Sequence, residues 1–423
     1  MRVVVLGGGS TGEHFVGALR RLDQSAELTL VERALVGGEC SYWACMPTKT
    51  MLRATELVAA TRHAPGLEAG GLDVSEVFRW RDLVVDERDD ARQVAFLDSM
   101  RCTLVRGDGL VAEPGVVRAG ERELPYDRLV IATGSSPVIP PVVEGLAYWT
   151  NREATETTEV PGSLLVLGGG PVGCELAQFF ARVGSKVTLV DEAERLLGKV
   201  DADAAALVQA SLEEDGIDIR LGETASNRLL LAFDRVLVAT GRRPNLDGLD
   251  GLGLAVSERG IEVDERVRAA ENVWAIGDVT GIADFTHLGK YQARVAAYDI
   301  AGRDARADYR ALPATIFTDP QVATVGTLEG RTARWELTST PRLSTYERPK
   351  RPGFVKVAAD PERRVLNGAV AVGPEAGEWL QQLTLAIRAE VPIETLLDVI
   401  PPYPTFNDAV FLALRELNFD LER

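Results

Sequence analysis

Two cysteines, Cys40 and Cys45, lie five residues apart in the segment GGECSYWACMPTK. Because the reducing cytosol disfavours purely structural disulfides, cysteines this close together in a chain with four cysteines call for a chemical reason. The segment has a helical pattern, in which the two side chains would point roughly 140° apart. Pro47 lacks an N–H group and its ring clashes with the carbonyl of Trp43, so we expect a loosened turn that lets the sulfurs meet. The alternative is two buried thiols that act as small hydrophobic side chains.

A glycine-rich turn near the N-terminus is the next feature with chemical meaning. Gly7, Gly9 and Gly12 form a GxGxxG pattern directly after the apolar run VVVL, and Glu32 closes the next expected strand about twenty residues on. The first glycine permits a tight turn, the second lets the backbone approach a pyrophosphate, and the third lets a helix lie against the strand. Glu32 would then bind ribose hydroxyl groups. The alternative is a strand, a turn and a helix with incidental glycines.

The same pattern recurs after the apolar run LLVL, which predicts a second dinucleotide site. Its glycines are Gly168, Gly170 and Gly173. Asp191 ends the following strand, KVTLVD, where a carboxylate binds ribose hydroxyl groups and repels a 2′-phosphate. We therefore expect NADH rather than NADPH, with NADPH as the alternative because basic residues lie nearby in sequence. These residues are Lys186, Arg195 and Lys199.

The two glycine turns belong to an internal repeat that defines the fold class. A second pair of segments, DRLVIATGSSP and DRVLVATGRRP, repeats a strand followed by a glycine turn. Strands that alternate with amphipathic helices predict an α/β protein with two doubly wound dinucleotide-binding domains. From Ala311 onward, the segment GFVKVAADPERRVLNGAVAVG predicts a hairpin and later segments predict helices. We therefore expect a C-terminal α+β domain.

The composition excludes several kinds of partner. The chain has 423 residues, with 46 Lys or Arg and 63 Asp or Glu, and a formal net charge of −17. This charge repels nucleic-acid phosphates and anionic lipids, so we expect no nucleic-acid and no membrane partner. The N-terminal apolar run is too short for a signal peptide and no later run could span a bilayer, which predicts a cytoplasmic protein. The histidines show no metal-ligand spacing, so no metal site is expected.

The order and spacing of these motifs resemble the class I pyridine nucleotide-disulfide oxidoreductases, the family of lipoamide dehydrogenase, glutathione reductase and mercuric reductase. The resemblance covers nearly the whole chain. Its motifs are the first GxGxxG, GGxCxxxxCxPxK (Gly37 to Lys49), ATGSSP, the second GxGxxG with Glu175, ATGRRPN, WAIGD (Trp274 to Asp278), FTDPQVATVG (Phe317 to Gly326) and YPTFND near the C-terminus.

The resemblance implies cofactors and domain boundaries. Residues 1–145 and 247–310 would bind FAD, residues 146–246 would form a shortened NAD(P)H-binding domain, and residues 311–423 would form the dimerisation domain. Gly277 and Asp278 would contact the ribityl-phosphate region of FAD. The other cofactor-binding positions that it implies are Gly38, Gly109, Thr133, Gly134 and Gly241.

The resemblance also assigns catalytic roles. Cys45 would be the flavin-proximal, charge-transfer thiolate, and Cys40 would attack the substrate. Lys49 and Glu175 match a pair beside the flavin N5 in relatives, where a positive charge helps to stabilise reduced flavin. The alternative for Lys49 and Glu175 is an ordinary surface ion pair, which contributes little.

The C-terminal motif departs from the pattern of the disulfide-reducing relatives. Those relatives carry HPTxxE, a His–Glu pair that reaches the neighbouring subunit's disulfide, whereas this chain has Tyr403 and Asp408 at the two positions. Mercuric reductases also have Tyr there but bear a C-terminal cysteine pair, which NFDLER lacks. By resemblance we expect a homodimer whose active site is shared between subunits. Tyr42 and Trp43, between the cysteines, are expected to reshape the substrate approach.

These features predict an FAD-dependent enzyme that moves electrons from NAD(P)H to the Cys40–Cys45 disulfide. The final acceptor would be a disulfide or another thiol-reactive small molecule. The alternative is a quinone, metal-ion or oxygen reductase that uses reduced flavin or the dithiol directly. A third hypothesis is a non-catalytic flavoprotein.

Overall fold

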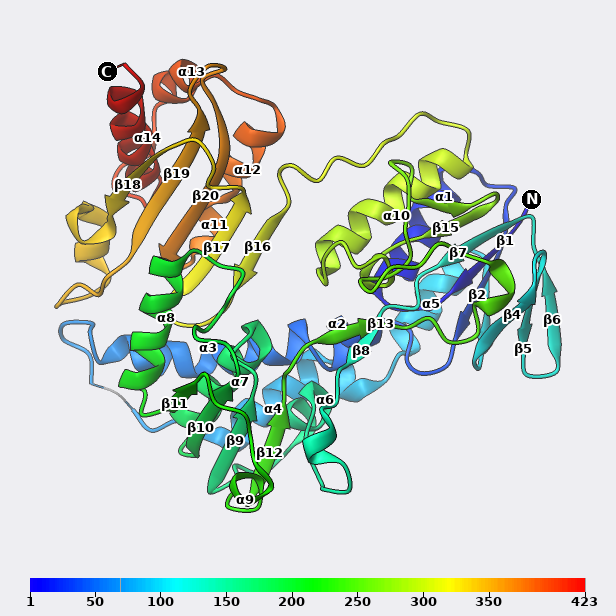
Figure 1. Cartoon of the computed structure of the whole chain (residues 1–423), viewed down its shortest axis with the longest axis horizontal. Helices are drawn as coiled ribbons and strands as arrows, with labels where there is room; N and C mark the ends of the chain where they lie inside the picture. Colours follow the sequence, from blue (N-terminus) through cyan, green and yellow to red (C-terminus); the bar gives the residue numbers. More distant parts are fainter. Residues whose placement is uncertain (69, 423) are drawn as a thin grey trace. The chain divides into compact units, whose positions relative to one another are not determined.

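The chain folds into helices that alternate with strands, as the sequence predicts (Figure 1). The computed structural model describes residues 1–68 and 70–422. These residues group into two compact units. Unit 1 comprises Met1–Thr48, Arg79–Ile139 and Gly241–Asp308, and unit 2 comprises Lys49–Phe78, Pro140–Thr240 and Tyr309–Arg423.

Unit 1 is built on a six-stranded sheet. In spatial order its strands are β14 (Arg268–Ala270), β15 (Val273–Ala275), β7 (Arg128–Ile131), β1 (Arg2–Leu6), β2 (Glu27–Glu32) and β3 (Cys102–Arg106). Strands β15 to β3 run parallel, and β14 is an antiparallel edge strand. Val3 and Val5 of β1 face one core while Val4 and Leu6 face another. Burial on both faces explains why this strand reads as a continuous apolar run.

Helices α1 (Ser10–Leu22) and α10 (Thr286–Ile300) pack together over the first of these cores (Figure 1). A three-stranded antiparallel sheet, β4 (Gly109–Glu113), β5 (Val116–Ala119) and β6 (Arg122–Pro125), belongs to the same unit. The segments that follow the repeated ATG motifs pair with each other, because β8 (Ser135–Pro137) and β13 (Arg242–Pro244) form an antiparallel ribbon. The two similar segments therefore contact each other directly.

The segment that carries the two cysteines is not one helix. Helix α2 (Gly38–Tyr42) ends at Trp43, and helix α3 (Cys45–Thr61) begins at the second cysteine. Pro47 lies in the first turn of α3, where a missing N–H group costs nothing. The expectation that Pro47 loosens a continuous helix was therefore wrong. The chain is broken between two helical segments instead, and Pro47 helps to start the second one.

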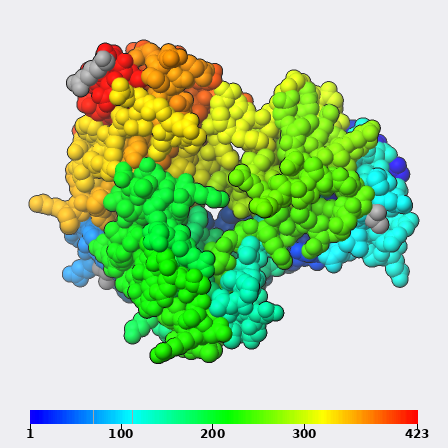
Figure 2. Space-filling view, viewed as in Figure 1, coloured from blue at the N-terminus to red at the C-terminus, as the bar shows by residue number. Residues whose placement is uncertain are grey.

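Unit 2 contains the second glycine turn in a four-stranded parallel sheet. The strands, in spatial order, are β11 (Asp218–Leu221), β10 (Lys186–Asp191), β9 (Ser163–Leu167) and β12 (Arg235–Val238). Helix α7 (Pro171–Arg182) follows the glycine turn, and α8 (Ala202–Glu214) follows β10. Between β11 and β12 the structure has only the short helix α9 (Asn227–Leu230), which accounts for the shortened sequence there. Exposed residues of α8 are visible in the green surface of the space-filling view (Figure 2).

The C-terminal part of unit 2 is a five-stranded antiparallel sheet covered by helices. Its strands, in spatial order, are β16 (Pro313–Ile316), β17 (Gln321–Gly326), β20 (Val365–Gly373), β19 (Phe354–Asp360) and β18 (Arg331–Glu336). The predicted hairpin is confirmed as β19 and β20. Helices α12 (Gln381–Arg388) and α14 (Asn407–Leu421) pack on this sheet, with Val355 and Leu417 in the shared core (Figure 1). The predicted α+β class is confirmed.

Among the residues that the structure describes, no helix combines the length and the apolar character needed to cross a bilayer. This finding agrees with the absence of a long apolar run in the sequence.

Candidate active site

The first glycine turn has the geometry that its sequence predicts. Gly7 adopts φ +100°, and a Cβ there or on Gly12 would collide with a backbone carbonyl. A Cβ on Gly9, by contrast, would meet nothing closer than the Cα of Gly38 at 4.0 Å. The first and third glycines are therefore required for the turn and the helix packing, while the second leaves open space at the N-terminus of α1. This space fits a pyrophosphate group.

The acidic residue at the end of β2 is held by the same turn. The Glu32 carboxylate accepts hydrogen bonds from the Gly8 amide at 2.6 Å and the Ala34 amide at 2.7 Å. A carboxylate has about four acceptor positions, so Glu32 keeps acceptor capacity for ribose hydroxyl groups. The Glu32 carboxylate fits the ribose, and the open turn at Gly9 fits the pyrophosphate, of a dinucleotide such as FAD.

Several positions that the resemblance implies lie beside this turn in unit 1. Gly277 has φ +80° and donates its N–H to Gln292, and the Asp278 carboxylate accepts from Ser135 at 2.7 Å. Burial raises the pKa of Asp278. Gly38 starts α2 and must be glycine, since its Cβ would lie 2.8 Å from the Cα of Gly9.

The remaining implied positions have local structural uses. The Thr133 hydroxyl donates to the Asn245 carbonyl at 2.7 Å. Gly134 and Gly241 have φ +70° and +131° with no atom within 4 Å of an added Cβ, so both leave open space. A Cβ on Gly109 would lie 2.5 Å from the Leu6 side chain. Packing alone accounts for Gly109, and its cofactor contact stays a prediction.

The second glycine turn repeats the first in unit 2. Gly168 has φ +105°, a Cβ on Gly168 or Gly173 would collide with a carbonyl, and nothing lies within 4 Å of a Cβ on Gly170. Asp191 accepts from the Gly169 amide at 2.5 Å and the Ala193 amide at 2.8 Å. Both turns thus place one carboxylate beside an open helix N-terminus, which fits a second dinucleotide.

The two cysteines meet at the break between α2 and α3. They are not joined by a disulfide in this structure. A hydrogen bond to Cys45, burial, and the charge of Cys45 together raise the pKa of Cys40, in that order of importance. The Thr286 hydroxyl, on α10, lies 3.6 Å from the Cys45 sulfur, and its interaction with Cys40 lowers the pKa of that thiol. The two thiols therefore interact and are only partly buried, whereas Cys102 and Cys174 are buried; that Cys40 and Cys45 react with each other stays a prediction.

Tyr42 and Trp43 do not lie along an approach to these thiols. Both side chains are buried, with exposed fractions of 1% and 8%, and they pack with Val85. The Tyr42 hydroxyl donates to the Val36 carbonyl at 3.0 Å. The expectation that this pair reshapes the substrate approach was wrong, because both rings are needed to fill a small core behind α2.

Lys49 and Glu175 form an ion pair in unit 2. The Lys49 Nζ lies 2.7 Å from a Glu175 oxygen, and the other oxygen accepts the Phe317 amide at 2.9 Å. The Lys49 ammonium also lies 5.0 Å from the centre of the Phe317 ring. Only 5% of the Glu175 side chain is exposed, so the surface ion-pair interpretation does not apply. The carboxylate has a fixed orientation because each oxygen has its own partner.

The sequence did not predict the structure that holds this pair. Helix α7 presents Glu175, Gln178 and Arg182 on one face to the segment between β16 and β17. Gln178 accepts the Asp319 amide at 2.8 Å and donates to its carbonyl at 3.0 Å, while Arg182 pairs with the Asp319 carboxylate at 3.0 Å. The sequence does contain a signal for this arrangement. Glu175, Gln178 and Arg182 are spaced by three and then four residues along α7, which places their polar side chains on one face of the helix.

Among the described residues, no hydrogen bond joins the side chains of Tyr403 and Asp408. Tyr403 is 71% exposed and Asp408 lies in the first turn of α14. Within residues 1–68 and 70–422, no side-chain hydrogen bond or ion pair involves the Tyr403 phenol or the Asp408 carboxylate. The neighbouring Ile400 is 92% exposed and Val399 is 55% exposed. This apolar stretch suits contact with another protein surface.

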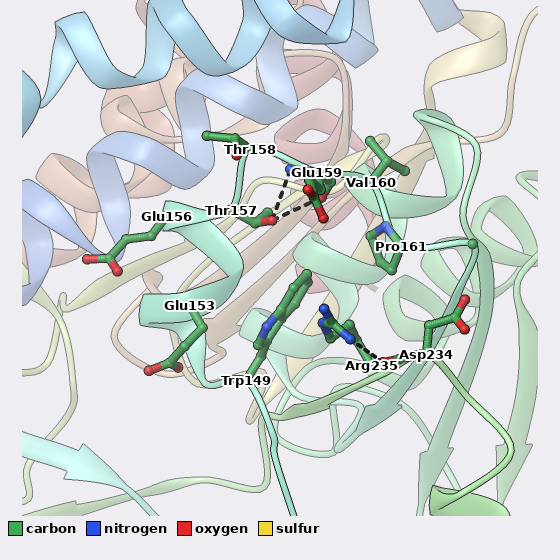
Figure 3. A pocket seen from close by; sticks show the side chains of 11 residues that line it. Trp149, Glu153, Glu156, Thr157, Thr158, Glu159, Val160, Pro161, Asp234 and Arg235 are labelled. Carbon is green, nitrogen blue, oxygen red and sulfur yellow. Dashed lines mark hydrogen bonds between the residues drawn. The ribbon is translucent and has the colours of Figure 1, made fainter.

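One pocket in unit 2 contains none of these residues. A cavity of about 680 Å³ is lined by Trp149, by Glu153 and by residues from 156 to 162, together with Asp234 and Arg235 (Figure 3). Gly162 and Asp234 directly precede β9 and β12, so the pocket lies at the amino ends of these strands. The glycine turn lies at their carboxyl ends. Among the described residues, no group of three or more His, Cys, Asp or Glu side chains could hold a metal ion.

Comparison with known proteins identifies relatives over the whole chain. Residues 1–301 match the family described as pyridine nucleotide-disulphide oxidoreductase, and residues 312–413 match the dimerisation domain of the same family. The chain is 32% identical to mercuric reductase of Shigella flexneri, over 100% of this chain and 82% of the relative. It is also 32% identical to dihydrolipoyl dehydrogenase 2 of Haloarcula marismortui, over 96% of this chain and 94% of the relative.

Two solved structures share the fold. LpdA of Mycobacterium tuberculosis superimposes with a TM-score of 0.88 at 25% identity, over 99% of both chains. RclA of Escherichia coli, a flavoprotein disulfide reductase induced by HOCl, superimposes with a TM-score of 0.84 at 24% identity, over 98% of this chain and 99% of that chain.

Proposed function

Because the chain belongs to the class I pyridine nucleotide-disulfide oxidoreductases and is thus an NAD(P)H-dependent flavoprotein disulfide oxidoreductase, we propose that its Cys40–Cys45 pair reduces a thiol-reactive small molecule. The observation that carries this proposal is the contact between the two thiols at the break between α2 and α3. Members of the family bind FAD and use NAD(P)H. A bound FAD would supply two-electron chemistry, between the nicotinamide hydride and a disulfide.

In this proposal, separate groups of residues bind the two cofactors and hold a positive charge near the site. The turns at Gly9 and Gly170 would hold the pyrophosphates, and Glu32 and Asp191 would hold the ribose hydroxyl groups. Residues 1–145 and 247–310 would bind FAD, and residues 146–246 would bind the nicotinamide nucleotide. Lys49 holds a positive charge that Glu175 keeps in place.

The thiol chemistry follows from the state of the two sulfurs. The neighbouring Cys45 and burial raise the pKa of Cys40, which favours the protonated form of this thiol. By resemblance to the family, Cys45 would be the sulfur that carries negative charge in the reduced pair. Cys40 attacks the acceptor when its proton leaves. With a disulfide acceptor, one S–S bond breaks and the Cys40–Cys45 bond forms, so that two electrons pass to the acceptor. The acceptor leaves as two thiols, with one proton from the cysteine pair and the second from solvent.

We propose NADH as the nucleotide, since the surroundings of Asp191 offer little to a 2′-phosphate. Arg195 donates to the Gly198 and Val200 carbonyls of its own loop at 2.9 Å and 2.8 Å. Lys186 begins β10 and so lies at the far end of the strand from Asp191. Of the three basic residues near Asp191 in sequence, this leaves Lys199 as the one that could bind a 2′-phosphate. A carboxylate at this place repels the 2′-phosphate of NADPH.

A metal-ion acceptor is the second candidate, and it is favoured because no hydrogen bond joins the Tyr403 and Asp408 side chains among the described residues. A positioned acid–base pair contributes roughly 10²–10⁴-fold to reactions that move protons. Soft metal ions bind thiolates and need no such pair. A relative at 32% identity is a mercuric reductase.

The family's dimerisation domain covers residues 312–413, and we propose a homodimer in which Tyr403 faces the partner subunit's Cys40.

Cysteine substitutions test the proposal. With NADH under anaerobic conditions, the wild-type protein should bleach its flavin within seconds and then reduce an acceptor from a screen of disulfides, quinones and soft metal ions. Cys40→Ser and Cys45→Ser should each still bleach but lose acceptor turnover. Cys102→Ser is the matched control, because Cys102 is buried in β3. Full turnover in Cys40→Ser would show that reduced flavin serves the acceptor directly.

A further inference from the structure

One arginine of unit 1 connects three segments that are distant in sequence. Arg242, the first residue of β13, donates from its Nε to the Ser135 hydroxyl at 2.7 Å and from its Nη2 to the Ser135 carbonyl at 2.8 Å. The Ser135 hydroxyl donates to the Asp278 carboxylate at 2.7 Å. The guanidinium also lies 3.8 Å from the carboxylate of Glu39, the residue before Cys40 on α2. All of these residues belong to unit 1.

The arginine fixes the direction of these hydrogen bonds. A guanidinium has donors and no acceptor, so the Ser135 Oγ must accept from Arg242. A hydroxyl group has one hydrogen, and the Asp278 carboxylate accepts it. Among the residues that the structure describes, Ser135 provides the side-chain donor to this carboxylate, which leaves its second oxygen available to another donor. Protonation would place a hydrogen on that second oxygen and weaken it as an acceptor.

The carboxylate lies beside the space that the first glycine turn leaves open. A Cβ on Gly277, the residue before Asp278, would lie 3.1 Å from the Oγ1 of Thr11, which is in the first turn of α1. The glycines that directly precede Ser135 and Arg242 have no atom within 4 Å of an added Cβ. The hydrogen-bonded chain therefore borders space in which a ligand of the α1 turn could continue.

We infer that Arg242 is a positioning residue for FAD, which holds the Asp278 carboxylate through Ser135 so that its second oxygen can accept a hydrogen bond from a ribityl hydroxyl group. Arg242 itself does not contact the reacting atoms in this inference. It rests on the proposed function only in taking Asp278 as a contact of FAD. It does not depend on the acceptor or on the choice of NADH.

The charges around Asp278 determine how firmly it stays ionised. Burial has the largest effect and raises the pKa of Asp278, and Asp284, in the loop before α10, raises it further. The hydrogen bond from the serine and the positive charge of Arg242 lower this pKa. Glu39 on α2 lies on the guanidinium, and the neighbour from α1 is the uncharged Thr11. Removal of the guanidinium should therefore let Asp278 take up a proton at a higher pH.

Release of FAD from the holoenzyme tests this inference. The dissociation constant would be measured on dilution, from the fluorescence of free FAD, across pH in wild type, Arg242→Gln, Arg242→Lys and Ser135→Ala. Arg242→Gln should weaken FAD binding roughly ten-fold at neutral pH, as expected for one charge-assisted hydrogen bond. The midpoint below which affinity falls should lie about one pH unit higher in Arg242→Gln and in Ser135→Ala than in wild type. Arg242→Lys keeps the charge and should bring the midpoint back toward that of wild type.

Arg243→Gln is the matched control. Arg243 is the next residue of β13, it is exposed, and within residues 1–68 and 70–422 its side chain forms no hydrogen bond or ion pair. This variant should bind FAD like wild type at every pH. A loss of affinity that is the same at every pH in Arg242→Gln, an unshifted midpoint in Ser135→Ala, or an equal shift in Arg243→Gln would overturn the inference. Ser135→Ala carries the test if Arg242→Gln does not fold. Failure to find an acceptor, with the shifted midpoint present, would refute the proposed function alone.

Discussion

Substitution of Asp319 by Asn should lower the free energy of unfolding of unit 2 more than the same substitution at an exposed aspartate. Asp319 is 9% exposed, and its carboxylate pairs with Arg182 at 3.0 Å and Arg351 at 2.9 Å. After the substitution, the new amide nitrogen would face a guanidinium N–H, so a donor would meet a donor. The substitution keeps the shape of the side chain and removes only the charge and one acceptor.

The magnitude can be worked from the partners that remain. Removing one member of a fully buried ion pair costs about 3–5 kcal/mol. Here Arg182 keeps Asp215 at 2.7 Å and Arg351 keeps Glu347 at 2.7 Å. We therefore expect a loss of about 2 kcal/mol, less than for an isolated buried pair. At about 2–4 °C per kcal/mol for a folded unit of this size, the melting temperature should fall by about 4–8 °C.

Calorimetry of the purified protein would measure this shift. Asp218→Asn is the matched control in the same unit, because Asp218 forms an equally short pair with Arg220, at 2.8 Å, but its side chain is 54% exposed. An exposed pair contributes about 0–1 kcal/mol, so this control should move the melting temperature little. Equal shifts in Asp319→Asn and Asp218→Asn would refute the reasoning from burial.

Three further predictions concern the site and its surroundings. Wild-type kcat/KM should be higher with NADH than with NADPH, and Asp191→Ala should narrow the ratio by removing repulsion of the 2′-phosphate; a strong wild-type preference for NADPH would contradict this. Tyr403→Phe should slow acceptor turnover and leave flavin reduction by NADH unchanged in stopped-flow traces; intact turnover would make Tyr403 a wall of the pocket, and a monomer in light scattering would end the shared-site proposal. Burial raises the pKa of Glu13 from its ordinary 4.5 to about 7, so the folded state loses stability as pH rises through this window. Glu13→Gln should therefore stabilise the protein by about 1–2 kcal/mol above the window and not below it, as urea unfolding at several pH values would show.

The sequence alone was sufficient for the features that local spacing controls. The glycine turns at Gly7 and Gly168 could be recognised because each needs a positive φ and a close helix approach within a few residues. The parallel strands read as apolar runs because both faces are buried, and the hairpin β19–β20 follows from alternation and turn residues. Fold class and family followed from these patterns.

The tertiary structure alone decided which distant side chains meet. Phe317 and Thr286 reach Lys49 and the cysteines from segments far along the chain, and no local period encodes such contacts. The sequence also suggested one helix through Cys40 and Cys45, whereas packing of Tyr42 and Trp43 with Val85 accompanies a break at that place. Helical propensity is worth only about 0–1 kcal/mol per residue, so the burial of two aromatic rings outweighs it.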